Sequence, residues 1–169
     1  ELKRLMAYRA KYNTNSSLAD GSEPMDVDDN DIKSGMEDIL ALGLSSRKNM
    51  CVHPVVSQER KGKVVDARCR DMTSAWACEK GRQEPGSVEL CDFHEELGKL
   101  DPGHLIPHGV WTIEELIEYA KDKGICPYFA VRRMMAFCDV IIYSFHYLLD
   151  PKVAEQVSKE ISKDAIVVF

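Results

Sequence analysis

The C-terminal stretch DVIIYSFHYLLDPKVAEQVSKEISKDAIVVF, residues 139–169, indicates the fold class. Its first segment, DVIIYSF, is an apolar run rich in β-branched residues, which is typical of a buried strand. The next segment predicts a helix that is opened by Asp150 and Pro151, and AIVVF predicts a second buried strand. Because a strand, a helix and a strand with short joints form a βαβ crossover, this stretch predicts part of a parallel sheet.

Two helices are predicted before this stretch. Thr112 begins a T-x-x-E capping box ahead of a helix over residues 113–123, and Gly124 is a stop signal at its end. A second helix is predicted from Pro127 to about Cys138, because proline suits the first helical position. Tyr143 and Tyr147 are expected to pack in the sheet, and His146 is interpreted as structural.

The N-terminal third divides into three parts. Apolar spacing in residues 1–12 predicts an amphipathic helix, and because it has no cap before it we expect the chain to be a piece of a larger protein. Residues 13–38 carry eight acidic side chains and one basic side chain among Ser, Asn, Gly and Pro, which predicts a disordered acidic loop. Residues 39–50 predict a strand at 39–44 that ends in a basic turn.

Length and charge exclude several classes of protein. The 169 residues suit one ordinary domain, and no apolar run approaches the ~20 residues of a bilayer span, so no membrane association is expected. The net charge of -6 is uneven. Residues 47–70 hold seven basic and two acidic side chains, and this basic stretch is suited to a polyanionic partner.

Four of the six cysteines, Cys51, Cys69, Cys91 and Cys126, are spread over a long polar region that has little core material. Their spacing alone leaves several interpretations open. Structural zinc usually shows a C-x-x-C pair, which is absent here, and disulfides need an oxidising compartment. An iron–sulfur cluster takes four thiolates and often has proline directly after a ligand, but ordinary buried thiols also fit. Cys78 and Cys138 are interpreted as ordinary buried thiols.

Four segments of the sequence are distinctive: SSRKNMCVHP at 45–54, ELCDFHEE at 89–96, CPYFAVRRM at 126–134 and IIYSFHYLLDP at 141–151. In this order they resemble the XPD helicase family of the transcription and repair factor TFIIH. Together with the intervening sequence, the resemblance covers nearly the whole chain except the acidic loop.

The resemblance implies a mainly α fold, with a small helical iron–sulfur domain inserted in a helicase motor domain. The four ligand positions of the family's 4Fe–4S cluster fall on the four cysteines named above. The cluster domain would span residues 51–138. Residues 1–12, 39–50 and the βαβ crossover at 139–169 would belong to the parallel sheet of the first motor domain.

The resemblance also implies what the parent protein does. It would be an ATP- and magnesium-dependent 5′–3′ DNA helicase of the nucleus, acting with TFIIH subunits in transcription and nucleotide excision repair. The family's D-E-A-H box would follow Phe169, and this chain has no phosphate loop. No catalytic residue is therefore assigned, and we expect no ATPase turnover from this chain alone. A zinc-binding interaction module and a related iron–sulfur helicase acting on replication or crosslink structures are the alternatives.

A cluster domain in such a helicase is expected to bind and gate single-stranded DNA. Tyr128 and Arg132 are four residues apart on one predicted helix face, where a ring and a guanidinium suit a stacked base and a phosphate. The alternative is that Tyr128 is a core residue. The predicted phosphate contacts lie in the basic stretch: Arg47, Lys48, Lys61, Lys63 and Arg68. Arg47 is also close enough to Cys51 in sequence to pack against an anionic cluster.

Overall fold

The computed structural model describes residues 39–101, 105–149, 151, 154, 165, 166 and 168. Its fold is mainly α, with one small parallel sheet, which confirms the fold class predicted from the sequence. The predicted helix at 1–12 and the acidic loop at 13–38 lie outside the described residues. No helix in the described part of the chain has both the length and the apolar content needed to cross a bilayer.

The sheet has three strands in the order β2-β1-β3, with β1 in the centre. β1 (Leu40–Gly43) is parallel to β2 (Gly109–Val110) on one side and to β3 (Val140–Ile142) on the other. Its four residues are all buried, which fits a strand covered on both faces. β1 and β3 confirm the strands predicted from the apolar runs, whereas the two-residue β2 has no sequence signal.

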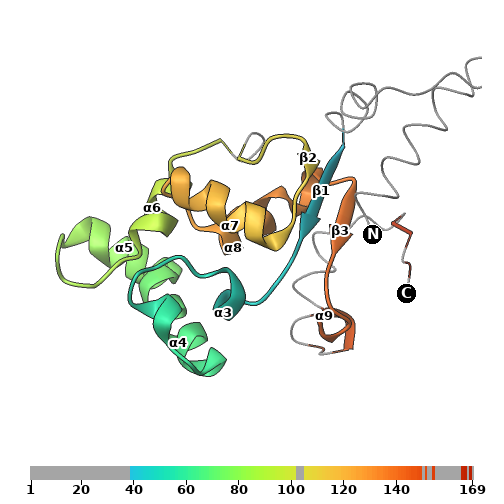
Figure 1. The fold of residues 1–169 in the computed structure, drawn as a ribbon. Helices are drawn as coiled ribbons and strands as arrows, with labels where there is room; N and C mark the ends of the chain where they lie inside the picture. Colours follow the sequence, from blue (N-terminus) through green and yellow to red (C-terminus); the bar gives the residue numbers. More distant parts are fainter. Residues whose placement is uncertain are drawn as a thin grey trace, which may run out of the picture.

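Helices follow the strands and the connecting loops. The first helix after β1 is α3 (Arg47–Met50). It is followed along the chain by α4 (Gly62–Thr73), α5 (Ala75–Gln83), α6 (Asp92–Gly98) and α7 (Ile113–Asp122). A 3-10 turn, η1 (Val56–Gln58), lies in the loop between α3 and α4. In Figure 1, α4 and α5 lie at the end of the molecule away from the sheet, with α7 and a further helix, α8 (Pro127–Met134), between them and the strands.

Two predicted helices are present. The Thr112 side chain accepts from the Glu115 amide at 3.2 Å, and the Glu115 carboxylate accepts from the Thr112 amide at 2.9 Å, so the capping box is confirmed. α8 (Pro127–Met134) begins at the predicted proline. The predicted end at Cys138 needs correction, because residues 135–137 form a 3-10 turn, η3 (Met135–Phe137).

Asp139, two residues after η3, joins the chain to the sheet. The Asp139 carboxylate accepts from the Leu40 amide at 2.8 Å, and the Asp139 amide donates to the Leu40 carbonyl at 2.9 Å. Both bonds hold the chain beside β1 at the start of β3.

The C-terminal crossover is only partly described. The short helix α9 (His146–Leu149) follows β3, and residues 151 and 154 are helical. The prediction of a final buried strand is wrong for its described residues, because Ile166 and Val168 are about nine-tenths exposed and are not in a strand. In the part of the chain that the structure describes, no strand pairs with them.

Two groups of buried side chains hold the fold together. The larger group joins β1 to α7 and α8 and includes Leu40, Leu42, Leu116 and Met134. Tyr143 and Tyr147 pack against it with their rings 6.0 Å apart, as expected. The smaller group consists of Val56, Val65, Met72 and Cys91, with Cys51 and Phe93 packed against it.

Candidate metal centre

The four widely spaced cysteines line one small pocket. Cys51 ends α3, Cys69 lies within α4, Cys91 precedes α6 and Cys126 precedes α8. Valine, methionine and phenylalanine side chains complete most of the lining, so the four thiols are the dominant polar groups that face it. The lining residues are Cys51, Val52, His53, Val56, Cys69, Met72, Thr73, Cys91, Phe93 and Cys126.

Local backbone geometry fixes Cys91 and Cys126 at the pocket wall. Both are extended residues immediately before a helix, and Pro127 follows Cys126 at the first helical position. The Cys126 amide donates to the Phe93 carbonyl at 2.9 Å, and the Cys91 amide donates to the Met72 carbonyl at 3.4 Å. These bonds tie the starts of α6 and α8 to each other and to α4.

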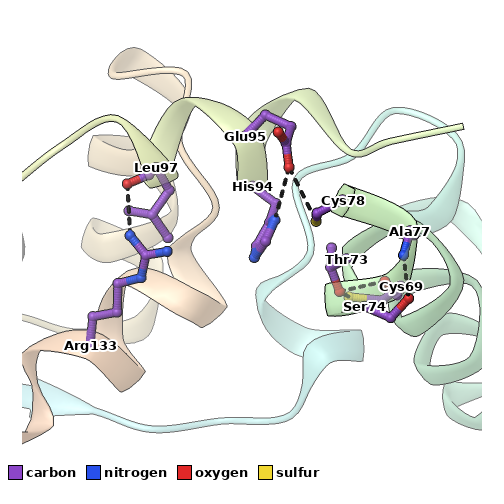
Figure 2. A network of polar contacts seen from close by, with 9 residues as sticks. All are labelled: Cys69, Thr73, Ser74, Ala77, Cys78, His94, Glu95, Leu97 and Arg133. Atoms are coloured by element: carbon purple, nitrogen blue, oxygen red, sulfur yellow. Dashed lines mark hydrogen bonds and ion pairs between the residues drawn. The ribbon is translucent and has the colours of Figure 1, made fainter. Parts of the chain in front are cut away.

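The other two cysteines are held by their own helices. The Cys51 amide donates to the Arg47 carbonyl at 2.8 Å and closes the single turn of α3. Thr73 lies one turn after Cys69 in α4, and its hydroxyl donates to the Cys69 carbonyl at 2.7 Å, as Figure 2 shows. Residues from four separate elements are thus brought to one point.

Burial makes three of these thiols weaker acids in the absence of a cation. Desolvation raises the pKa of Cys51 and Cys91, and it raises the pKa of Cys126 to about 12. Repulsion from Cys69 raises all three pKa values further, while backbone N–H groups act in the opposite direction. A bound cation would reverse the balance, because metal-bound cysteine is a thiolate.

A zinc ion and an iron–sulfur cluster can both be bound by four cysteines, but they need different spacings of the sulfur atoms. In a tetrahedral zinc site with Zn–S bonds of about 2.3 Å, the sulfur atoms lie roughly 3.8 Å apart. No three of the four described sulfur atoms lie within 4.8 Å of one another. Four thiolates around an apolar pocket, spaced more widely than one zinc ion needs, fit an iron–sulfur cluster.

The two remaining cysteines lie outside this pocket. Cys78 is buried with its sulfur 3.4 Å from a Glu95 carboxylate oxygen, and Cys138 donates to the Met134 carbonyl at 3.1 Å. The structure therefore separates the same four cysteines from the other two as the sequence interpretation did.

Arg47, Tyr128 and Arg132 form one stacked group. The Arg47 guanidinium carbon lies 4.5 Å from the centre of the Tyr128 ring, and that of Arg132 lies 5.4 Å from it. Arg47 also lies 3.9 Å from the Asp66 carboxylate and 5.7 Å from the Phe129 ring centre. The sequence predicts that Tyr128 and Arg132 share one helix face. It gives no sign that Arg47 contacts Tyr128, because the two residues lie far apart in the chain.

This group is largely internal. Tyr128 is 5% exposed and belongs to the larger buried group, which matches the core alternative for this residue. The Arg47 Nε atom is buried and has no hydrogen-bond partner. In this conformation the Tyr128 ring is covered by the two guanidinium groups, and a base would have to displace one of them to stack on it.

The remaining predicted DNA contacts fall into two kinds. The Lys48 ammonium donates to the carbonyls of Ser57 and Glu59 and closes the loop that follows Cys51. Arg68 is paired with the Glu59 carboxylate at 3.3 Å. Lys61 and Lys63 are exposed at the start of α4, where they are accessible to a polyanion.

Comparisons with known proteins place the chain in a family. The sequence model of the family DEAD_2 matches residues 1–169. The XPD helicase subunit of general transcription and DNA repair factor IIH from Schizosaccharomyces pombe is 50% identical over 169 residues, which cover all of this chain and 19% of that protein. The XPD/RAD3 subunit from Saccharomyces cerevisiae is 54% identical over 134 residues, 79% of this chain and 17% of that protein.

A more distant relative gives a contrast. The Fanconi anemia group J protein homolog from Gallus gallus is 26% identical over 129 residues, 73% of this chain and 9% of that protein. The family model covers the whole chain, which is therefore a member of the DEAD_2 family. Within DEAD_2, the chain belongs to the XPD helicase family, of whose members it spans less than a fifth of the length.

Proposed function

We propose that Cys51, Cys69, Cys91 and Cys126 bind a 4Fe–4S cluster, and that this cluster holds α4, α5 and α6 in place. The observation that carries the proposal is the convergence of these four cysteines, from four elements, on one apolar pocket. An all-cysteine cluster has no open iron position, so a structural role is favoured over substrate chemistry. Metal binding would supply folding free energy that the small core around Val65 does not.

A zinc-binding interaction module is the alternative for the same four residues. The separation of the sulfur atoms favours the cluster, because one zinc ion would need at least three of them within about 4 Å of each other.

Analysis of iron, sulfide and zinc decides between the two. The full-length helicase would be purified without oxygen, together with the Cys126→Ser variant and Cys138→Ser as the matched control. We expect one sulfide for each iron in the unsubstituted protein, and the same iron content in the Cys138→Ser control. Cys126→Ser should lose most of its iron. Zinc in place of iron in the colourless parent protein would overturn the proposal.

The whole protein of which this chain is a piece is proposed to be an ATP- and magnesium-dependent 5′–3′ DNA helicase within TFIIH. The support is the 50–54% identity to subunits named as factor IIH helicases of transcription and DNA repair. A role in nucleotide excision repair, association with TFIIH subunits and a nuclear location follow from that membership. Relatives named for telomere elongation or Fanconi anemia are only 26–27% identical, which makes the related-helicase alternative weaker.

In this helicase the cluster domain is proposed to bind and gate one DNA strand. Lys61 and Lys63 are exposed and would contact phosphates, whose binding releases counterions. Arg47, Arg68, Lys48, Tyr128 and Arg132 were the other predicted contacts. Because Lys48 and Arg68 already hold partners, they would support the loop beside Cys51 and contact DNA only by giving those partners up.

Charge reversal tests the DNA interface. Lys61→Glu with Lys63→Glu in the full-length protein should weaken single-stranded DNA binding by roughly tenfold at low salt and reduce the dependence of affinity on salt. Lys121→Glu is the matched control, since Lys121 is exposed on α7, outside the basic stretch. Equal effects of the two changes would contradict a local interface.

A further inference from the structure

Cys78, His94 and Glu95 form a second cluster of metal-binding side chains. One ligand atom from each lies within 4.8 Å of the other two. Cys78 comes from α5, and His94 and Glu95 come from the first turn of α6, with the three side chains pointing toward one another in Figure 2. None of the three lines the four-cysteine pocket.

The distances within this cluster match the edges of a small tetrahedron. The Cys78 sulfur lies 3.4 Å from Oε1 of Glu95, and Nδ1 of His94 lies 3.5 Å from the same oxygen. With metal–sulfur bonds of about 2.3 Å and metal–nitrogen or metal–oxygen bonds of about 2.0–2.1 Å, a tetrahedral zinc ion separates such atoms by roughly 3.4–3.6 Å. Two of the three edges therefore have the length that one ion would set, and the third is no longer than 4.8 Å.

One nitrogen atom in this cluster has no hydrogen bond from the protein. Nδ1 of His94 is buried and has no hydrogen-bond partner, although buried polar atoms are almost always bonded. Its ring is held in place by an edge contact with Phe129, the ring centres being 4.7 Å apart. The Cys78 thiol donates a hydrogen bond to the Glu95 carboxylate. Nδ1 of His94 lies 3.5 Å from the same carboxylate but forms no hydrogen bond with it.

A cation would satisfy all three groups at once. Sulfur, imidazole nitrogen and carboxylate oxygen are the three donor types that zinc takes in proteins. Cys78 is buried, whereas about a third of the Glu95 side chain is exposed, so an ion has access from the solvent side. On binding, the Cys78 thiol would release its proton to solvent, because the metal-bound form is the thiolate.

We propose that Cys78, His94 and Glu95 bind one divalent cation of the zinc class, with a water molecule in the fourth position. The site would link α5 to α6. It would thus brace a part of the molecule that has few buried apolar side chains.

Metal analysis of the cluster-loaded, full-length protein tests the site. The protein would be incubated with zinc chloride, dialysed to remove loosely held ion, and analysed for zinc and iron. Cys78→Ala and Glu95→Gln are the test variants, and Cys138→Ala is the matched control. We expect one zinc per chain in the parent and the control, at least tenfold weaker zinc binding in both test variants, and unchanged iron in all four proteins.

Zinc-edge X-ray absorption on the parent identifies the ligands. One sulfur and three nitrogen or oxygen neighbours are expected. Zinc surrounded by four sulfur atoms, with iron lost, would place the ion in the four-cysteine pocket and overturn both this site and the proposed cluster. No retained zinc in the iron-loaded parent, or equal zinc in the parent and Glu95→Gln, would overturn this site alone.

Discussion

The sheet half of this molecule (β1, β3, α7 and α8) and its cysteine half (η1, α4 and α5) differ in how much apolar side chain they bury. Around β1, α7 and α8 the described residues include sixteen buried side chains in one continuous group. Around α4 and η1 the corresponding group has four, and one of these is Cys91. Since burying an apolar side chain contributes about 1.5–3 kcal/mol, the second group gives α4 and α5 little packing energy of their own. We therefore expect the cysteine half to depend on what its thiols bind.

Removing one thiolate from the pocket should have the largest effect. In Cys126→Ser of the full-length protein, loss of the cluster should release the segment between Cys51 and Cys91, because α4 and α5 would lose their main link. We expect proteolysis within that segment to be faster by about tenfold or more, with cleavage sites read by mass spectrometry. Cys138→Ser should leave the pattern unchanged, and equal protection of all three proteins would show that the small core is sufficient.

A large-to-small substitution in the core tests the stability of the sheet half. Leu42 is 1% exposed in the central strand, so Leu42→Ala should lower the free energy of unfolding by about 2–5 kcal/mol. Iron per folded chain should stay the same, because the strand carries no ligand. Urea unfolding measures the change, and Ile142→Ala, at a half-exposed position of β3, is the control with a smaller expected loss. Loss of iron in folded Leu42→Ala would mean that the two halves are not separable.

Arg47 joins the two halves, and its removal should have an intermediate effect. Its guanidinium lies against Tyr128 of α8 and near Asp66 of α4. Arg47→Ala should cost about 1–2 kcal/mol through the lost cation–π contact, and should speed hydrogen exchange at α4 and the start of α8. Arg47→Lys should recover part of the loss. Faster exchange in the sheet half only would argue against a bridging role.

The smallest effect is expected from Cys138, and it depends on pH. Burial, followed by the nearby Asp139 carboxylate, raises the pKa of this thiol to about 12 from 9.0. Because the folded pKa is the higher one, the neutral thiol's contribution to stability is complete below pH 9 and is lost as the pH rises from 9 toward 12. At half a pH unit above 9 the loss is below about 1 kcal/mol. Cys138→Ala should unfold with a shallower dependence on pH above 9 in an alkaline titration, and an identical slope in both proteins would contradict this.

The sequence predicted those features that depend on neighbouring residues. The capping box at Thr112, the proline start of α8 and the apolar runs of β1 and β3 involve contacts within about one helical turn or one strand. The family resemblance then selected the four cysteines that line one pocket, together with the membership that the comparisons confirm. Their ligand role and the boundaries of the cluster domain stay predictions.

The sequence did not predict α4, α5 and α6. α4 buries only Val65 and Met72, and α5 only Ala77 and Cys78, so neither has the apolar stripe by which a helix is recognised. The use of Lys48 to close the loop after Cys51 was also missed, since a lysine in a basic stretch gives no sign of which carbonyls it will reach. The cluster of Cys78 with His94 and Glu95 combines helices that are separated by a loop of unremarkable composition.

The sequence by itself therefore determined the capped start of α7, the proline start of α8, the two longer strands and the family to which the chain belongs. Only the tertiary structure decided that Arg47 covers Tyr128, that Asp139 bonds to Leu40 beside β1, and which donors share a pocket. The physical reason is the distance along the chain over which each interaction acts. Caps, turns and strand periodicity are set by interactions between residues close together in the chain, whereas a site made from four elements exists only after packing has fixed how those elements lie against one another.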